Sequence, residues 1–190
     1  MKLLFATTNP GKFREAADAV KENDLQLEQA NIEIEEPKIL EIRETAERKA
    51  QLAFNALGKP VAVEDTGVFF DEYPLFPGTY SKFAVKTLGI PALLKLLERR
   101  KRGARFVTVA AYCDGKTTKT FEGEARGTML ETPEGESRLG LAYDSVFKCE
   151  GCGKTFARMT VAEKNMHSHR AKAFRKLAEW LARKEKLAES

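Results

Sequence analysis

At 190 residues, the chain is long enough to bury one sizeable hydrophobic core, in one domain or in two closely packed lobes. Lysine and arginine total 32 against 28 acidic residues, and the net charge of +4 is too small to indicate general binding to nucleic acid or to a membrane surface. The first apolar run is too short for a signal peptide, and no later run approaches the length of a membrane span. We therefore expect a cytoplasmic protein without a membrane or nucleic-acid partner.

The first strand and the first helix are predicted to meet at a polar turn. Residues 2–8 are rich in β-formers, and Asn9-Pro10-Gly11-Lys12 leads into a helical pattern from Phe13 to about Glu22. Such a turn gathers backbone N–H groups at a helix N-terminus, where Lys12 adds a positive charge, so it is a candidate phosphate site. The spacing is not that of a Walker A loop. The alternative is a plain turn with a solvated lysine.

A half-buried strand over residues 25–34 and a helix over residues 42–57 follow, separated by an acidic stretch. Lys49 lies among small residues on the apolar side of this helix. A lysine in that position either extends from the edge of the core to solvent or points into a cleft. The pattern does not choose between these two orientations.

Two adjacent acids follow the next buried strand. Val61, Ala62 and Val63 predict a short strand that delivers Glu64 and Asp65 before Thr66-Gly67 ends it. Because the carboxyl ends of strands line the ligand crevice of open α/β sheets, this acid pair could hold a divalent metal ion or act as a general base. Alternatively, Asp65 caps its own turn and the pair has only a structural role.

The middle of the chain predicts a loop, two helices and a hairpin. Residues 74–83 are rich in turn formers and aromatic residues, and helical segments are expected around 80–87 and 90–101. Residues 105–114 and 117–127 form a hairpin across Asp114-Gly115, which is one of the strongest short-range hairpin signals. A polar connection then leads to a glycine-led turn at 140–147.

The last helix is predicted from about Ser168 to Lys186, with a buried stripe of alanine, leucine and phenylalanine. Lys164, Ser168, His169 and Arg170 crowd its N-terminus. Cations there oppose the helix dipole unless an anion or a polar ligand is also present. The cluster is therefore a functional clue rather than a helix cap.

A zinc finger is the main alternative for residues 149–170. Cys149-x-x-Cys152 with His167 and His169 downstream resembles the C2H2 pattern. However, 14 residues separate Cys152 from His167 instead of about 12, and only Ser168 lies between the histidines, where a finger has about three to five residues. We therefore expect ordinary turn cysteines, and a zinc-dependent nucleic-acid-binding protein stays the less favoured alternative.

Five motifs, in this order and across nearly the whole chain, resemble the inosine/xanthosine triphosphate pyrophosphatase family, also called the Ham1-like family. Each motif is weak alone, but the set is specific. The motifs are Thr-Thr-Asn-Pro-Gly-Lys at 7–12, Val-Glu-Asp-Thr-Gly at 63–67, Phe-Pro-Gly-Thr-Tyr-Ser-Lys-Phe at 76–83, Ala-Tyr-Asp-Ser-Val-Phe at 142–147, and Lys-Thr-Phe-Ala-x-Met with Glu-Lys-Asn-x-x-Ser-His-Arg at 154–170.

The resemblance implies an α/β fold of two lobes, with a long twisted mixed β-sheet flanked by helices and a central cleft. It implies a single domain over residues 1–190 that forms a homodimer. It also implies Mg²⁺-dependent hydrolysis of ITP, dITP or XTP to the monophosphate and pyrophosphate, which removes these unusual purine nucleotides from the nucleotide pool. The expected cofactor is Mg²⁺, and the expected ligands are purine nucleoside triphosphates.

Site roles follow from the resemblance, residue by residue. Asp65 would be the catalytic residue, acting as a metal ligand and as the general base for water, with Glu64 beside it. The remaining matched positions would bind the substrate. Asn9 and Lys12 would hold the triphosphate, with Lys49 and Lys164 adding charge, and the purine would be bound by Tyr143, Asp144, Ser168, His169 and Arg170, with Lys82 nearby. The other substrate-binding positions would be Thr7, Thr8, Thr66, Leu141 and Ala142. Several lysines would neutralise a polyanion whose charge shifts in the transition state.

Hydrogen bonding at C6 of the purine gives a physical reason for selectivity among bases. Hypoxanthine and xanthine present a C6 carbonyl acceptor where adenine presents an amino donor, so donors such as Arg170 and backbone N–H groups would favour them. Adenine would leave a buried donor unpaired, at a cost of about 1–3 kcal/mol per group. Guanine shares the 6-oxo group, and the pattern does not explain its rejection.

The chain departs from the family pattern at three places. The glutamate that usually follows proline before the second helix is Lys38 here, so Glu36 or Glu41 would have to supply the second metal carboxylate, and we favour Glu36. The usual Phe-Gly before the aromatic-Asp pair is Leu141-Ala142, which would loosen stacking on the base. Thr66 replaces a serine and keeps the hydroxyl group. Because of Lys38, a catalytically weak nucleotide-binding homologue is a second alternative.

Overall fold

The computed structural model describes residues 1–34, 39–137 and 140–188, and these contain a seven-stranded mixed sheet. The strand order is β2-β1-β3-β5-β6-β7, and β4 pairs with β3 outside this path. β1 is parallel to β2 and to β3, and all other pairs are antiparallel. The strands are β1 (Lys2–Ala6), β2 (Gln26–Ala30), β3 (Val61–Phe70), β4 (Tyr73–Gly78), β5 (Gly103–Cys113), β6 (Thr118–Met129) and β7 (Phe147–Cys149).

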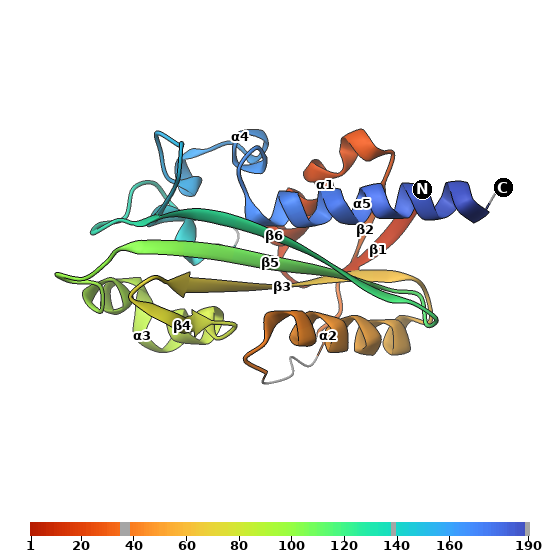
Figure 1. The fold of residues 1–190 in the computed structure, drawn as a ribbon, viewed down its shortest axis with the longest axis horizontal. Helices are drawn as coiled ribbons and strands as arrows, with labels where there is room; N and C mark the ends of the chain where they lie inside the picture. The colour runs from red at the N-terminus through yellow and green to blue at the C-terminus, as the bar shows by residue number, and fades with distance from the viewer. Residues whose placement is uncertain (35–38, 138–139, 189–190) are drawn as a thin grey trace.

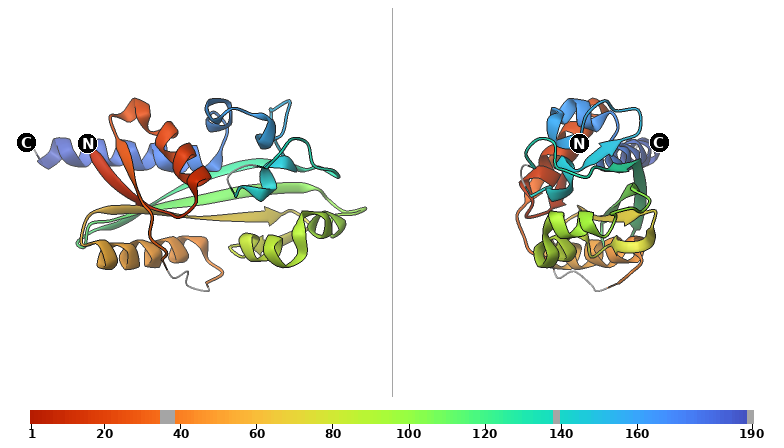
Figure 2. Two further views of the ribbon diagram at one scale, coloured as in Figure 1. Left: turned by 180° about the vertical axis from the view of Figure 1, so that it is seen from behind. Right: turned by 90° about the vertical axis from the view of Figure 1, so that its left-hand side faces the viewer.

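Helices cover both faces of this sheet. Figures 1 and 2 show α1 and α5 on one side of the long strands β3, β5 and β6, and α2 and α3 on the other side. The α-helices are α1 (Pro10–Ala19), α2 (Ile42–Leu57), α3 (Ser81–Lys95), α4 (Val161–Asn165) and α5 (His169–Ala188), and short 3₁₀ turns are η1 (Lys21–Asn23), η2 (Ala142–Ser145) and η3 (Phe156–Arg158). None of the helices in the described residues is long and apolar enough to cross a bilayer.

The hydrophobic core is divided by the sheet. One buried cluster lies between the sheet and α1 and α5, and a second lies between the sheet and α2. A third cluster occupies the other end of the long strands, where it joins α3, η2 and η3. β5 is buried along most of its length because helices cover both of its faces, and its stretch from Phe106 to Cys113, apolar except for Thr108, fits that position. The predicted mixed α/β fold is confirmed.

The predicted end of the third strand at Thr66-Gly67 is wrong. β3 continues through Gly67 to Phe70, and Gly67 pairs with Val107 within an unbroken ladder to β5. The glycine serves packing instead of a turn, because a Cβ atom there would lie 2.7 Å from the Phe69 ring. Glu64 and Asp65 are consecutive residues in the middle of a strand, so their side chains leave it on opposite faces.

Other elements agree with the pattern in part. The hairpin of β5 and β6 and the last helix are confirmed. The first helix begins at Pro10, three residues before its predicted start, because proline suits the first helical position. The first part of the loop predicted at 74–83 belongs to β4, and the two predicted helices at 80–87 and 90–101 are replaced by α3, which is kinked at Gly89.

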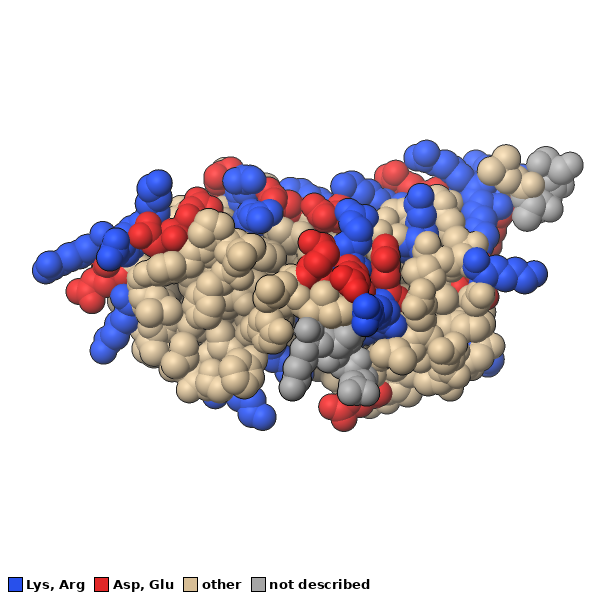
Figure 3. All heavy atoms as spheres, turned by 60° about the horizontal axis from the view of Figure 1, so that its bottom comes forward, with Lys and Arg blue, Asp and Glu red and all other residues tan. Residues whose placement is uncertain are grey.

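Large apolar side chains are exposed on β4, on α3 and between them. Leu75, Phe83 and Leu88 are more than half exposed, and Tyr80 and Leu96 are also exposed. Figure 3 shows a broad face with few charged side chains on the half of the molecule that holds β4 and α3, while charged side chains gather toward the middle. An apolar surface of this kind is typical of a contact between proteins.

Candidate active site

A cavity of about 820 Å³ brings the distant sequence motifs together. Its walls come from the end of β1, the start of α1, the middle of β3, the start of α3, η2 and the start of α5. The sequence-predicted residues that line it are Thr7, Thr8, Asn9, Lys12, Lys49, Asp65, Thr66, Lys82, Leu141, Ala142, Tyr143, Asp144, His169 and Arg170. Lys164 and Ser168 are buried behind this lining, and Glu36 lies outside the described residues.

The N-terminus of α1 opens into the cavity. Asn9 is the N-cap, and its Oδ1 accepts a hydrogen bond from the backbone N–H of Lys12 at 3.0 Å. The hydroxyl of Thr7 accepts one from the backbone N–H of Asn9 at 3.2 Å, which fixes the turn before the helix. Unpaired backbone N–H groups and the helix dipole favour an anion at such a terminus. Because Lys12 also lines the cavity, the predicted phosphate site has the required chemistry.

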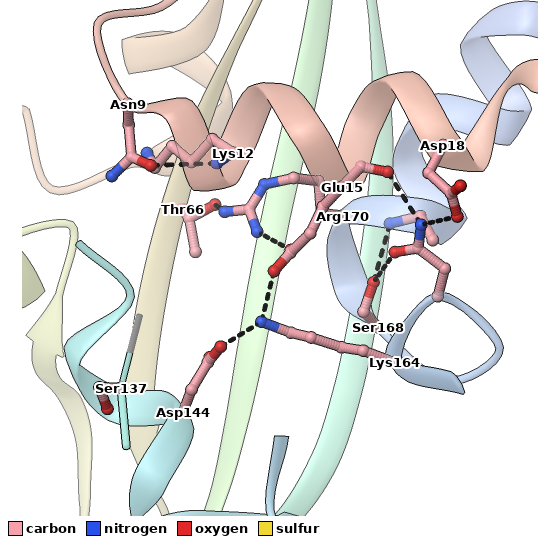
Figure 4. A network of polar contacts seen from close by, with 12 residues as sticks. Asn9, Lys12, Glu15, Asp18, Thr66, Ser137, Asp144, Lys164, Ser168 and Arg170 are labelled. Carbon is pink, nitrogen blue, oxygen red and sulfur yellow. Dashed lines mark hydrogen bonds and ion pairs between the residues drawn. The ribbon is translucent and has the colours of Figure 1, made fainter. Parts of the chain in front are cut away.

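Six charged side chains form a chain of ion pairs along the cavity floor, with positive and negative groups in alternation. Four of them line the cavity, and Glu15 and Lys164 lie behind it. Most of this network is visible in Figure 4, where Arg170 lies below α1 and Lys164 reaches between two carboxylates. The order of the chain is Lys12, Glu64, Arg170, Glu15, Lys164 and Asp144. The joined atoms lie 2.6, 2.8, 2.5, 2.6 and 2.5 Å apart in that order.

Arg170 is the centre of this network and is only 1% exposed. Its Nε donates to Glu64 at 2.8 Å, its Nη1 donates to Glu15 at 2.5 Å, and its Nη2 donates to Thr66 at 3.3 Å. Burial by itself would raise the pKa of Glu64, but Arg170 and Lys12 outweigh it and hold that pKa far below its usual range. The guanidinium is therefore fixed in place by two carboxylates and a hydroxyl group.

Asp144 and Tyr143 occupy η2 at the other end of the network. Burial raises the pKa of Asp144 despite its ion pair with Lys164, and burial also raises the pKa of Tyr143. The hydroxyl of Tyr143 donates to the backbone oxygen of Ser81 at 3.2 Å, which ties η2 to the start of α3. These contacts hold the two sides of the cavity together at this end.

An aromatic wall stands beside the charged floor. The ring of Phe106 lies 5.1 Å from that of His169 and 6.1 Å from that of Tyr143, and both contacts are edge-to-face. Burial, with the charges of Arg170 and Lys164, lowers the pKa of His169 well below 6.5. The imidazole is therefore neutral at physiological pH and offers one donor and one acceptor. Within the described residues, its Nδ1 has no hydrogen-bond partner.

Two further carboxylates and two lysines also line the cavity. Asp65 is 7% exposed on β3, and Glu33 is an exposed residue that precedes the undescribed segment. Lys49 from α2 is buried at the cavity edge, and Lys82 from α3 is exposed. Carboxylate oxygens suit Mg²⁺, which proteins bind through one or two carboxylates together with substrate phosphates and water. The donor set therefore fits this ion.

Sequence reasoning missed Glu15, Ser81 and Phe106. Glu15 lies on the buried side of α1 beside Ala16 and Ala19, so an acid among small apolar residues at helical spacing was the available signal. Phe106 is one of many apolar residues in β5, and its pattern does not separate a cavity wall from the core. Ser81 contributes a backbone oxygen, for which a sequence has no signal.

We predict that Arg170→Met destabilises the fold by about 3–5 kcal/mol, because it leaves the buried carboxylates of Glu64 and Glu15 without their central partner. Chemical denaturation at neutral pH measures the change. The matched control is Arg183→Met, which removes an exposed ion pair to Glu179 on α5 and should change stability by less than about 0.5 kcal/mol. Equal losses in the two variants would contradict the assignment.

The buried His169 predicts a pH dependence of stability. As pH falls below about 6.5, the unfolded chain protonates this histidine and the folded chain does not, so stability present above pH 6.5 is lost on acidification. The slope from this one group is at most about 1.4 kcal/mol per pH unit. Urea unfolding from pH 8 to pH 5 should show a steeper loss for the native sequence than for His169→Gln. Parallel curves over the whole range would show that His169 titrates normally.

Comparisons with known proteins show which family the chain belongs to. The sequence profile described as the Ham1 family matches residues 3–180. The protein named dITP/XTP pyrophosphatase in Methanopyrus kandleri is 41% identical over 182 residues, which cover 95% of this chain and 96% of the relative. Its namesake in Saccharolobus solfataricus is 40% identical over 185 residues, which cover 95% and 94%.

Solved structures show the same fold. A HAM1 protein from Coxiella burnetii superposes with a TM-score of 0.80 at 23% identity, over 96% of this chain and 99% of that chain. The Ham1 protein of Staphylococcus aureus superposes with a TM-score of 0.75 at 26% identity, over 95% and 98%. Because the profile and the relatives both match nearly the whole chain, this protein belongs to the Ham1 family.

Proposed function

We propose that this chain hydrolyses dITP, XTP and ITP to the corresponding monophosphate and pyrophosphate. The observation that carries the proposal is the single cavity in which an anion-binding helix N-terminus, the Asp65 carboxylate and an aromatic wall meet. The helix N-terminus would bind the triphosphate, the carboxylate would serve its hydrolysis, and the aromatic wall would bind the purine. The curated relatives named dITP/XTP pyrophosphatase support the choice of substrates.

The triphosphate would bind between the start of α1 and the lysines of the cavity. Backbone N–H groups after Asn9 and the ammonium groups of Lys12, Lys49 and Lys82 would neutralise its charge. Lys12 already pairs with Glu64 at 2.6 Å, so its side chain is oriented toward the cavity floor before substrate arrives. Lys164 would act indirectly, because it is buried among Glu15 and Asp144 and does not line the cavity.

Mg²⁺ would be held by Asp65 together with the substrate phosphates. The expected second ligand, Glu36, lies outside the described residues, and Glu33 is a further carboxylate in the cavity lining. When bound, the ion would neutralise phosphate charge and act as a Lewis acid. This ligand type and number suit Mg²⁺ better than a softer metal.

Asp65 would act as the general base. Its carboxylate would take a proton from a water molecule whose oxygen attacks the α-phosphorus, while the bond from that phosphorus to the bridging oxygen breaks and pyrophosphate leaves. Glu64 is less suited to this step, because Lys12 and Arg170 hold its pKa far below the usual range. The two neighbouring acids would therefore have different roles, one catalytic and one structural.

The purine would lie against Phe106, Tyr143 and His169. Neutral His169 can present a donor to the C6 carbonyl of hypoxanthine or xanthine, whereas the donors of Arg170 are already directed at Glu64, Glu15 and Thr66. Arg170 would then mainly hold the residues of the base pocket in place and would not be the main hydrogen-bond donor to the purine. A buried donor without an acceptor would disfavour adenine.

We predict that Asp65→Asn lowers kcat with dITP and XTP by about 10²–10⁴-fold, because an amide cannot accept the proton of the attacking water. Pyrophosphate release measures the change, and circular dichroism checks that the variant stays folded. The matched control is Asp71→Asn, an exposed acid just beyond the end of the same strand, which should keep full activity. Retained turnover in Asp65→Asn would remove Asp65 from the base role.

We further propose that the exposed apolar surface on β4 and α3 joins two copies of the chain in a homodimer. Leu75, Phe83 and Leu88 on that surface would be buried by self-association. Phe83→Glu should therefore halve the molar mass in light scattering at micromolar concentration, whereas Leu187→Glu, at an exposed apolar residue near the end of α5, should not. A monomeric native chain would contradict the proposal.

A further inference from the structure

Three metal-binding side chains converge outside the cavity. The sulfur atoms of Cys149 and Cys152 and an imidazole nitrogen of His167 all lie within 4.8 Å of one another. No other group of three histidine, cysteine or acidic residues in the described part of the chain comes together in this way. Both cysteines are buried and neither forms a disulfide.

The local structure explains how residues so far apart in sequence meet. Cys149 ends β7 and pairs with Gly127 of β6, and the backbone N–H of Cys152 donates to the oxygen of Cys149 at 3.0 Å. Gly151, with φ of 73°, provides the left-handed residue that closes this turn. His167 lies in the turn between α4 and α5, where its backbone N–H donates to Lys164 at 3.0 Å.

The geometry is close to that of a zinc site. A tetrahedral Zn²⁺ ion with bonds of about 2.3 Å to sulfur and about 2.0–2.1 Å to nitrogen places its ligand atoms about 3.5–3.8 Å apart. Ligand atoms within 4.8 Å of one another therefore need shifts of about 1 Å or less to reach this arrangement. Two thiolates and one imidazole favour zinc over the hard ions that carboxylates prefer.

We propose that Cys149, Cys152 and His167 bind one Zn²⁺ ion, with water as the fourth ligand. Each thiol would release its proton as its sulfur binds the metal. The site differs from the zinc finger that the spacing argues against, because His169 is not part of it. That histidine lies beside Phe106 in the cavity wall instead.

Such an ion would link the turn after β7 to the turn between α4 and α5, and so would fix the position of the α5 N-terminus. The β7 turn supplies the cysteines, and His167 directly precedes Ser168, whose hydroxyl accepts the backbone N–H of Ala171 at 3.1 Å in the first turn of α5. The proposed metal site is independent of nucleotide hydrolysis. Its expected effect is a higher thermal stability with metal than without it.

The test is a titration of the metal-free, reduced full-length protein with Co²⁺, which reports thiolate ligands through charge-transfer absorption and tetrahedral geometry through its visible bands. We expect both signals to saturate at one ion per chain, and Zn²⁺ to displace Co²⁺ and remove them. We also expect Zn²⁺ to raise the melting temperature. Absence of the charge-transfer signal in the native sequence would overturn the proposal.

Variants assign the ligands. Cys149→Ser, Cys152→Ser and His167→Gln should each weaken Co²⁺ binding at least 10-fold, while Cys113→Ser, at a buried cysteine in β5, should bind as the native sequence does. Circular dichroism of each metal-free variant checks folding. Unchanged affinity in His167→Gln, or equal losses in all four variants, would contradict the three-ligand site. Bound Zn²⁺ should also protect Cys149 and Cys152 from oxidation to a disulfide. If the disulfide forms equally well with and without added Zn²⁺, the three-ligand site is contradicted.

Discussion

The buried contact of Arg170 with Glu64 and Glu15 is the interaction on which the candidate active site depends. It joins α5, β3 and α1, which are far apart in sequence, at a point where all three side chains are nearly inaccessible to solvent. A buried guanidinium between two carboxylates costs desolvation energy, and the contact is favourable only when its geometry and its hydrogen bonds are complete. The network therefore fixes the position of α1 relative to β3, and with it the distance between the proposed phosphate site and Asp65.

The long sheet explains why these elements can meet. β3 runs for 10 residues and β5 for 11, and helices cover both faces, so a strand can present functional groups in its middle without losing its ladder. The side chains of Glu64 and Asp65 leave β3 on opposite faces of the sheet. One acid leaves β3 toward Arg170 and Lys12 and becomes part of the structure, and the other leaves on the opposite face, where we propose that it acts on water.

Much of this arrangement could be predicted from the sequence, because local patterns and whole motifs were both present. The strand, turn and helix around Asn9 and the hairpin at Asp114-Gly115 follow from turn chemistry, and they are confirmed. The predicted break at Gly67 is wrong, because the sequence does not distinguish a glycine that makes room for a neighbouring ring, here that of Phe69, from a glycine that allows a turn. Local rules describe backbone preference and do not show which side chain fills the space above a glycine.

The site residues that the sequence did not predict were missed for a related reason. Glu15 is important because of what lies opposite it, namely Arg170 and Lys164, and no pattern within α1 reports those partners. The same holds for Cys149, Cys152 and His167, whose spacing argued against a zinc finger although the fold brings the three together. Sequence spacing tests a known local motif, whereas a ligand set assembled from β7 and the turn before α5 is visible only in three dimensions.

The most direct test of the central claim is the specificity constant for pyrophosphate release with a panel of nucleotides in the presence of Mg²⁺. We expect kcat/KM for dITP and XTP to exceed that for dATP by at least 10-fold, because the cavity must pair a C6 carbonyl and exclude a C6 amino group. Equal values for dITP, XTP and dATP, or no release of pyrophosphate from any of them, would contradict it.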